Sequence, residues 1–558
     1  MKVAVRLTRA GFIAILLAIP LQSAARTTDA GPVPHAQAVQ PLRMLLSAPA
    51  PSVDGEMLKR PTELLRFYAE RGDLPAWSAE GEMDPRAGSL LDLFVAADRE
   101  GLDPRDYHAA AIAARLARAQ TGPHELAELD LLLTDAVMQY AGHLRAGRIQ
   151  PRSIDADLAL VPPPVDVVAA ARHVLSAPDP AAALAGFAPP HTGYAALRQG
   201  LAELRAFAAR GGWSLAGPGP VLKPGMIDPS VPPLRRRLAA TGDFAGADLA
   251  SEFYDVELEQ AVRGFQERMG LGVDGVVGPR TRSALNISIE ERIDQVIANL
   301  ERWRWLPDQL GDRYVAVNVP GYSLEAIEGG EVRLAMPVIV GSKSRETPVL
   351  GGKISHLVLN PTWTIPETIA RKDVLPKVIE DPGYLIAQGI RVFDGWSADA
   401  PMLDPYAVDW KAVGTRITRY RLRQEPGPLN ALGRVKFMFP NEFDVYLHDT
   451  PQRGKFSRAV RTLSSGCVRV GDPEALTAFL VEGMNDWPQE RRSQVLDGGA
   501  TTTVWLRRPV PVYLLYRTAW RDDDGRMVFR PDIYDRDPRL IEALGRRNAP
   551  LRVAAGQS

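Results

Sequence analysis

Residues 446–469 read YLHDTPQRGKFSRAVRTLSSGCVR and contain Cys467, the only cysteine among the 558 residues of the chain. His448 follows an alternating apolar pattern over residues 445–447, so we expect it at the end of a β-strand. Cys467 lies nineteen residues later, directly after Gly466. A histidine and a thiol form a base and a nucleophile when the fold brings them together. The stretch therefore predicts a cysteine nucleophile within a β-rich domain.

The pattern around this stretch predicts where that domain begins and ends. From residue 312 the apolar period is two, as in the valines at 315, 317 and 319, and residues 504–516 are rich in β-formers. Between about 364 and 432 the alternation is replaced by a mixed, partly helical stretch with many prolines. We therefore expect a mostly-β domain at 312–508 with an insertion at about 364–432, followed by a C-terminal extension at 509–558.

The first half of the chain has helical periodicity. Apolar residues recur at spacings of three and four across residues 56–225, which predicts a domain of amphipathic helices packed on one another. Residues 226–290 predict a small three-helix module with a turn at Asp274-Gly275, and 291–311 a connecting helix. The expected fold class is multidomain α+β.

The N-terminus has the features of an export signal. Three basic residues precede an apolar run at 11–21, and small residues precede a cleavage site after Ala25, so we expect a signal peptide over residues 1–25. An uncleaved anchor is the alternative, although the run is short for a bilayer span. Residues 26–55, rich in Ala, Pro and Thr, predict a flexible linker. We expect an exported protein without a stable membrane span after cleavage.

Composition excludes several classes of protein. Lysine plus arginine number 66 against 67 aspartate plus glutamate, a formal net charge of −1, which disfavours a nucleic-acid binder. A single cysteine can form neither a disulfide framework nor a cysteine-rich zinc site. No serine is followed three residues later by lysine, so the acyl-serine motif of penicillin-binding proteins is absent. After export, an unpaired thiol is either buried and inert or takes part in the reaction of the protein.

The stretch that opens this section resembles the active site of the L,D-transpeptidases of the YkuD fold. The matching residues are His448, Ser464, Gly466, Cys467, Val468 and Arg469. Ser465 stands where most of that family has a second histidine. The Ser-Ser-Gly-Cys-Val-Arg-Val form is similar to the large YcbB-like branch, which lies in the periplasm of Gram-negative bacteria and has a helical scaffold domain. Residues 262–286 resemble a peptidoglycan-binding domain, with a generic three-helix module as the alternative.

The resemblance implies a reaction and a role for each site residue. Cys467 would attack the carbonyl between diaminopimelate and D-alanine of a peptidoglycan tetrapeptide stem. His448 would be the general acid and base, held in its working tautomer by a backbone carbonyl such as that of Asp449, and amides around Gly466 would stabilise the oxyanion. The implied substrate-binding residues are Tyr446, Ser465, Arg469 and Trp363.

The product implied by the resemblance is a 3→3 cross-link, formed when an amine of a neighbouring stem resolves the Cys467 thioester during cell-wall biogenesis. The insertion would cap the catalytic cleft, and carbapenems would acylate Cys467. Donor and acceptor stems are the expected partners, other wall-synthesis enzymes are further candidates, and no cofactor or metal is expected. Two rivals remain: an L,D-carboxypeptidase or endopeptidase that uses the same Cys-His pair, and a non-catalytic peptidoglycan-binding scaffold.

Overall fold

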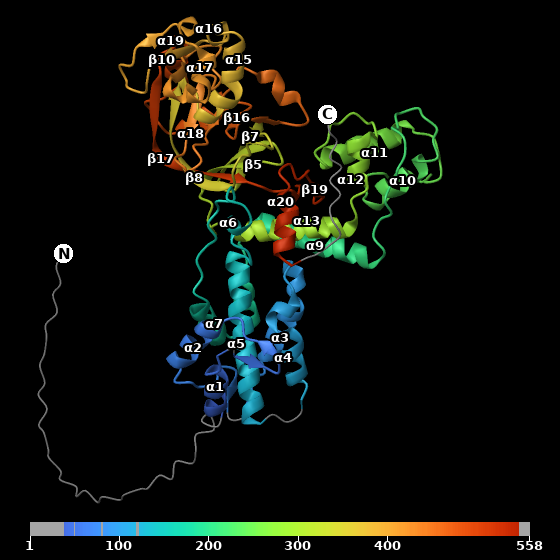
Figure 1. Ribbon diagram of the computed structural model, residues 1–558. Coiled ribbons are helices and arrows are strands. Elements are labelled where there is room, and N and C mark those ends of the chain that lie inside the picture. The colour runs from blue at the N-terminus through green and yellow to red at the C-terminus, as the bar shows by residue number, and fades with distance from the viewer. Residues whose placement is uncertain (1–37, 50, 80–81, 119–121, 546–558) are drawn as a thin grey trace, which may run out of the picture.

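The computed structural model describes residues 38–49, 51–79, 82–118 and 122–545. Figure 1 shows a column of helices at the base, a small helical module to one side, and a β-sheet domain with its own helical cap at the top. Two crossing helices, α9 (Thr192–Ala209) and α13 (Ile289–Arg304), lie between the column and the sheet. This arrangement confirms the predicted order of a helical region, a small module and a β-rich domain. The expected signal peptide, residues 1–25, lies outside the described residues.

The helical column is built around α5 (Pro123–Ala146), which is buried along most of its length because other helices surround it. Its buried polar residues are paired: the Asp130 carboxylate accepts hydrogen bonds from the Tyr68 hydroxyl and from the Trp77 amide. These two aromatic side chains are therefore part of the core. The other helices of the column are α1 (Val39–Leu46), α2 (Pro61–Glu70), α3 (Ala87–Val95), α4 (Ala109–Leu116), α6 (Pro151–Ile154), α7 (Val167–Ser176) and α8 (Pro180–Ala185).

The expected flexible linker at 26–55 is wrong for its second half. Residues 39–46 form α1, which packs on α5, and residues 52–53 pair with 56–57 in a small hairpin. Leu42 and Leu46 point into the column and are buried. The Ala-, Pro- and Thr-rich composition of residues 26–55 is typical of a linker, but the spacing of four between Leu42 and Leu46 places both on one helix face.

Helices α9 and α13 join the parts of the molecule. A capping box between Ser288 and Glu291 begins α13. Near its end, the buried Arg304 guanidinium pairs with the Glu301 carboxylate at 3.0 Å and donates to the Tyr194 hydroxyl of α9 at 2.9 Å. Such a buried charge is stable only with partners of this kind. Helix α13 also contacts the column and the C-terminal elements, so it is a structural centre rather than a simple connector.

The small module has the expected three helices, α10 (Val231–Ala240), α11 (Val256–Arg268) and α12 (Pro279–Leu285). The Asp255 carboxylate caps α11 by accepting from the Leu258 amide. The Gln266 side chain accepts hydrogen bonds from the amides of Asp274 and Gly275 and so holds the turn between the last two helices.

The main sheet has nine strands in the order β15-β7-β16-β14-β13-β8-β17-β5-β6, and β7 also pairs with β6, which closes the sheet on itself. Apolar side chains fill its interior. The strands are β5 (Arg313–Asn318), β6 (Ser323–Glu328), β7 (Glu331–Gly341), β8 (Leu350–Leu359), β13 (Val435–Met438), β14 (Leu447–His448), β15 (Thr462–Ser464), β16 (Val468–Val470) and β17 (Thr502–Leu515). Two helices accompany the sheet, α18 (Pro473–Val481) and α19 (Gln489–Gly498).

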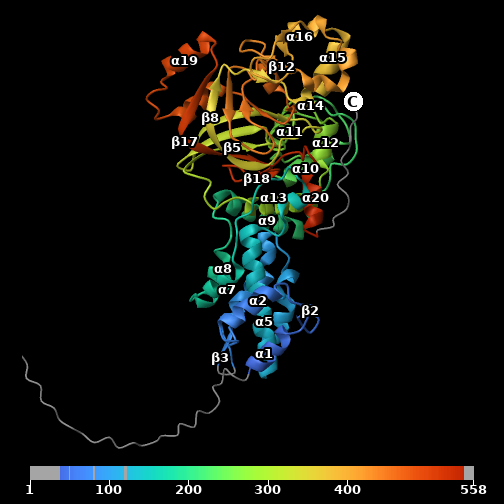
Figure 2. The ribbon, with the colours of Figure 1, turned by 60° about the vertical axis from the view of Figure 1, so that its left-hand side comes forward.

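The insertion forms a separate cap between β8 and β13. Its four-stranded sheet has the order β11-β10-β12-β9, and helices cover it around a core of its own. Figure 2 shows this cap and α19 at opposite sides of the main sheet. The strands are β9 (Trp363–Thr364), β10 (Ile390–Phe393), β11 (Met402–Leu403) and β12 (Arg421–Gln424), and the helices are α14 (Glu367–Ile369), a π-helical turn at Ala370–Val374, α15 (Leu375–Glu380), α16 (Gly383–Ala387) and α17 (Trp410–Val413).

The expected end of the domain at residue 508 falls inside β17. That strand pairs with β8 along its length and with β5 at residues 512–515, so the main sheet continues past the expected boundary. The chain then forms the hairpin β18 (Ala519–Arg521) and β19 (Met527–Phe529) and the helix α20 (Arg536–Ala543). These elements pack on α9 and α13. The segment predicted as an extension therefore joins the sheet to the helices beneath it.

Replacement of Leu42 by alanine tests the position of α1. Leu42 has no exposed surface, so Leu42→Ala should lower the free energy of unfolding by about 2–5 kcal/mol. Met44, on the same helix, is 63% exposed, and Met44→Ala should leave stability within about 0.5 kcal/mol. Urea unfolding followed by circular dichroism measures both variants, and equal midpoints would contradict the packing of α1.

Candidate active site

The register of three strands places ionisable side chains in one row. Lys436 of β13 is paired with His448 of β14, and His448 is paired with Arg469 of β16. Tyr446 and Cys467 lie two residues before His448 and Arg469, and side chains two residues apart share a face of a sheet. The intervening residues, Phe437, Leu447 and Val468, are buried in the core on the other face. The structure thus brings the predicted nucleophile and base to the same face of the sheet.

His448 is held as a neutral base. Its Nδ1 lies 2.5 Å from the backbone oxygen of Asp449, and because a carbonyl only accepts, Nδ1 carries the proton and Nε2 is left with a free lone pair. Burial, together with the positive charges of Arg469 and Lys436, lowers the pKa of His448 to about 3. The expected carbonyl partner is therefore present, and the imidazole is ready to accept a proton.

The environment of His448 is itself fixed. The Asp449 carboxylate accepts from the Thr450 and Arg434 amides and from the Arg453 guanidinium. These three bonds anchor the residue whose backbone carbonyl orients the imidazole. Such supporting contacts set the orientation of a catalytic base in the way that a third triad residue does.

Cys467 is half-buried, and burial raises the pKa of its thiol. Hydrogen bonds from Tyr446 and the charges of Lys436 and Arg469 oppose this effect but are smaller. The resting thiol is therefore protonated at neutral pH. A protonated thiol beside a neutral imidazole requires the proton to move as the nucleophile attacks, rather than before.

Side-chain hydrogen bonds hold the loop before Cys467, which we call the nucleophile loop. The Ser464 hydroxyl donates to the Cys467 carbonyl at 2.5 Å and accepts from the Gly466 amide at 3.2 Å, while the Thr347 hydroxyl donates to the Gly466 carbonyl at 2.7 Å. Gly466 has φ +113°, which L side chains rarely adopt. Because its own N–H is used inside the loop, the Cys467 N–H, without a protein acceptor among the described residues, is the better oxyanion donor.

Ser465 contacts Arg345, a residue that no sequence motif singles out. Its hydroxyl accepts a hydrogen bond from Arg345 at 2.7 Å, and the same guanidinium makes two bonds to the Asp373 carboxylate, at 2.6 and 2.9 Å. Asp373 lies in the π-helical turn of the cap. Arg345 therefore connects the nucleophile loop to the cap. These three residues are far apart in the chain, and no local pattern signals their contact.

Tyr446 and Trp363 form the other connection between the site and the cap. The Trp363 indole, at the first strand of the cap, lies close enough to the Tyr446 phenol to affect its pKa, and so does the Cys467 thiol. The Lys436 ammonium lies 3.9 Å from the centroid of the Tyr446 ring. Of the expected substrate-binding residues, Trp363 is the most distant from Cys467 in sequence. The Tyr446 side chain nevertheless lies between it and the nucleophile.

Arg469 has an uncompensated charge. Its guanidinium donates to the Gln452 side chain at 3.2 Å, and within the described part of the chain no carboxylate lies within ion-pair distance of it. Burial lowers its pKa. A positive group of this kind beside the thiol suits a ligand carboxylate.

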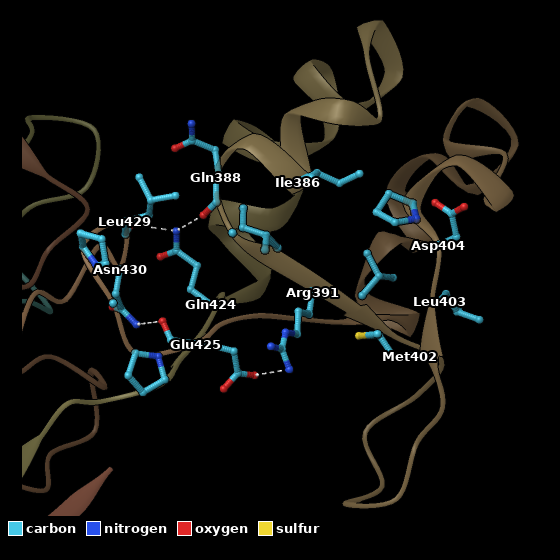
Figure 3. Close-up of a pocket in the computed structure, with 17 residues that line it drawn as sticks. Ile386, Gln388, Arg391, Met402, Leu403, Asp404, Gln424, Glu425, Leu429 and Asn430 are labelled. Atoms are coloured by element: carbon cyan, nitrogen blue, oxygen red, sulfur yellow. Dashed lines mark hydrogen bonds and ion pairs between the residues drawn. The ribbon is translucent and has the colours of Figure 1, made fainter. Parts of the chain in front are cut away.

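A cavity of about 560 Å³ lies in the cap, away from Cys467. It is bordered by β10, β11 and β12 (Figure 3). Gln424 crosses one side, where its amide donates to the carbonyls of Gln388 and Leu429, and Arg391 faces Glu425 at 3.7 Å on another. The nucleophile and the base do not line this cavity, so the reaction has to occur outside it.

The protonation states described above predict the pH dependence of thiol alkylation. Because burial raises the pKa of Cys467, its alkylation by iodoacetamide should rise with pH to a midpoint above the ordinary thiol range of about 8.5. Because His448 stays neutral down to about pH 3, no reactive plateau should appear at pH 5–6. Rates measured by intact mass test this, and a plateau at pH 5–6 would indicate a thiolate–imidazolium pair instead.

Three domain families match the sequence. Residues 62–201 match the family described as "Scaffold domain", residues 228–285 the "Putative peptidoglycan binding domain", and residues 312–495 the "L,D-transpeptidase catalytic domain". A Haemophilus influenzae protein described as "Putative L,D-transpeptidase" is 39% identical over 254 residues, which is 45% of this chain and 50% of that relative. The match therefore spans half of the relative's length.

Two solved structures were also found. The L,D-transpeptidase of Xylanimonas cellulosilytica is 17% identical, with 54% of this chain and 100% of that chain covered and a TM-score of 0.18. The L,D-transpeptidase of Stackebrandtia nassauensis is 15% identical, with 54% and 97% covered and a TM-score of 0.20. The site geometry and the three domain matches agree: the chain combines a scaffold domain, a peptidoglycan-binding domain and an L,D-transpeptidase catalytic domain of the YkuD family.

Proposed function

We propose that this protein is an L,D-transpeptidase that forms 3→3 cross-links between peptidoglycan stem peptides through a thioester on Cys467. The observation that carries the proposal is the matched catalytic domain with a thiol, a neutral imidazole and a guanidinium on one face of its sheet. The peptidoglycan-binding domain at 228–285 supports the choice of substrate. Donor and acceptor are both tetrapeptide stems, and the reaction needs no cofactor.

In the first half-reaction, the thiol proton moves to Nε2 of His448 as sulfur attacks the carbonyl carbon between diaminopimelate and D-alanine. The Cys467 N–H stabilises the resulting oxyanion. The carbon–nitrogen bond then breaks, and the departing D-alanine amine takes the proton from His448. Arg469 holds a carboxylate of the donor stem, since no carboxylate in the described part of the chain forms an ion pair with it.

In the second half-reaction, the side-chain amine of diaminopimelate on a neighbouring stem attacks the thioester. His448 accepts the amine proton and returns a proton to sulfur, so the thiol and the neutral imidazole are both restored. Water in place of the amine would release a tripeptide, which is the carboxypeptidase alternative. Trp363 and Tyr446 lie between the cap and the site. There they favour attack on the thioester by the amine of a stem peptide over attack by water.

The proposed setting is the periplasm of a Gram-negative bacterium, reached by means of the signal peptide expected at residues 1–25. The peptidoglycan-related domains support a location at the cell wall. Among the described residues, no helix combines the length and apolar character that a bilayer span requires. Other wall-synthesis enzymes are proposed partners.

The products formed from purified tetrapeptide muropeptides distinguish the candidate functions. We expect dimers joined through two diaminopimelate residues, with release of D-alanine, and Cys467→Ala should abolish both products because no other thiol exists in the chain. A carbapenem should add one covalent adduct at Cys467, seen by intact mass. Tripeptide without dimer would support the hydrolase alternative, and the absence of both dimer and tripeptide with the parent protein would support the non-catalytic scaffold.

Disruption of the Arg345–Asp373 pair should slow cross-linking by about fivefold, because a partly exposed bidentate pair contributes about 1 kcal/mol to holding the cap. The double variant should be no slower than Arg345→Ala, since both lack the Arg345–Asp373 pair, while Asp373→Asn keeps the bond from Arg345 to Ser465 and should be no slower than either. Arg371→Ala is the matched control: it breaks an exposed pair with Glu367 in the same cap and should leave the rate unchanged. Additive losses in the double variant would contradict a role for this pair as one unit.

A further inference from the structure

Lys436 is a charged residue of the catalytic sheet to which neither the reaction nor the family pattern assigns a role. It lies in the middle of β13, directly across from His448. Its side chain is half-buried, and no carboxylate in the described part of the chain lies within ion-pair distance of its ammonium. The group that it does contact is an aromatic ring, that of Tyr446, whose centroid lies 3.9 Å from Nζ. A half-buried ammonium without an acidic partner is costly, so its position requires a physical reason.

The contact with Tyr446 connects Lys436 to the nucleophile. Tyr446 and Cys467 are neighbours across β14 and β16, where the Val468 amide donates to the Tyr446 carbonyl, so the ring under the Lys436 ammonium lies beside the nucleophile. An ammonium over an aromatic face is attracted to the negative face of the ring and so favours the ring in that position. The same contact therefore orients the phenol and brings a positive charge close to Cys467.

Two cations act on the thiol, and His448 is not one of them. The charges of Lys436 and Arg469 both lower the pKa of Cys467, and the same charges help to keep His448 neutral. The other titratable groups nearby are Asp444, which acts on Lys436, and His356 on β8, whose pKa Lys436 lowers. The site therefore has two fixed positive charges facing one sulfur and no fixed negative charge in contact with it.

We propose that Lys436 is a positioning residue of the nucleophile: its ammonium fixes the Tyr446 ring against Cys467 and supplies the positive charge that the developing thiolate needs. His448 then moves the proton without having to remain as an imidazolium. One further point rests on the proposed function, in which the carboxylate of the donor stem neutralises Arg469. Lys436 is then the cation that still faces the sulfur when the substrate is bound.

The test is the pH dependence of Cys467 alkylation by iodoacetamide in the full chain, which needs no peptidoglycan. Its result is therefore independent of the proposed function. Lys436→Met keeps an unbranched chain against the Tyr446 ring and removes the charge. We expect its alkylation midpoint to move up by about one pH unit, which is about a tenfold slower reaction below the midpoint. Lys436→Arg should restore the rate to within about threefold, because its guanidinium also stacks on aromatic rings.

Lys377→Met is the matched control. The Lys377 ammonium lies 4.9 Å over the Tyr384 ring in the cap, away from the thiol, so this variant should keep the parent midpoint. Lys436→Gln, a polar neutral replacement, provides a second measurement if the methionine variant fails to fold by circular dichroism. An unchanged midpoint in the neutral variants would overturn the proposal. Equal losses in Lys436→Arg and Lys436→Met would also overturn it, because they would assign the effect to packing alone.

Discussion

The register of three short strands is the constraint on which the active site depends. Pairing of β13, β14 and β16 aligns Lys436, His448 and Arg469 across one face and places Tyr446 and Cys467 in the next row. A slip of one residue in β14 would exchange His448 for Leu447 and bury the imidazole in the core. The apolar residues that alternate with these groups prevent that slip, so the core packing and the site geometry are two results of one pairing.

This register also determines the electrostatics. Two positive side chains flank a buried imidazole and a half-buried thiol, and no carboxylate enters the row. As a result, the imidazole remains neutral, the thiol remains protonated at rest, and charge develops only during attack. A protonated thiol is oxidised more slowly than a thiolate, which suits the only cysteine of a protein expected to be exported. The near-zero net charge of the whole chain therefore conceals a locally positive site.

The sequence was informative where a residue's role depends on its neighbours in the chain. His448 at a strand end, the glycine before Cys467 and the Asp449 carbonyl partner are all local, and the structure has each of them. Lys436 and Arg345 were missed because their partners lie ten or more residues away, across strands or in the cap. Helix α1 lies in a stretch whose composition is typical of a linker, and the spacing of Leu42 and Leu46 is the sequence feature that indicates it.

The cap is attached to the catalytic sheet on both sides of Cys467. On one side, Arg345 joins Ser465 of the nucleophile loop to Asp373; on the other, Trp363 reaches the thiol through Tyr446. A movement of the cap therefore has to pull on the loop that orients the Cys467 amide and on the phenol that contacts its sulfur. The Tyr446 ring also contacts Lys436 of the sheet itself, at 3.9 Å from Nζ, so with the proposed role of Lys436 its orientation does not depend on the cap alone. The strands β13, β14 and β16 thus carry the reacting groups, and the cap contributes Trp363 and Asp373, whose contacts with the site depend on the position of the cap.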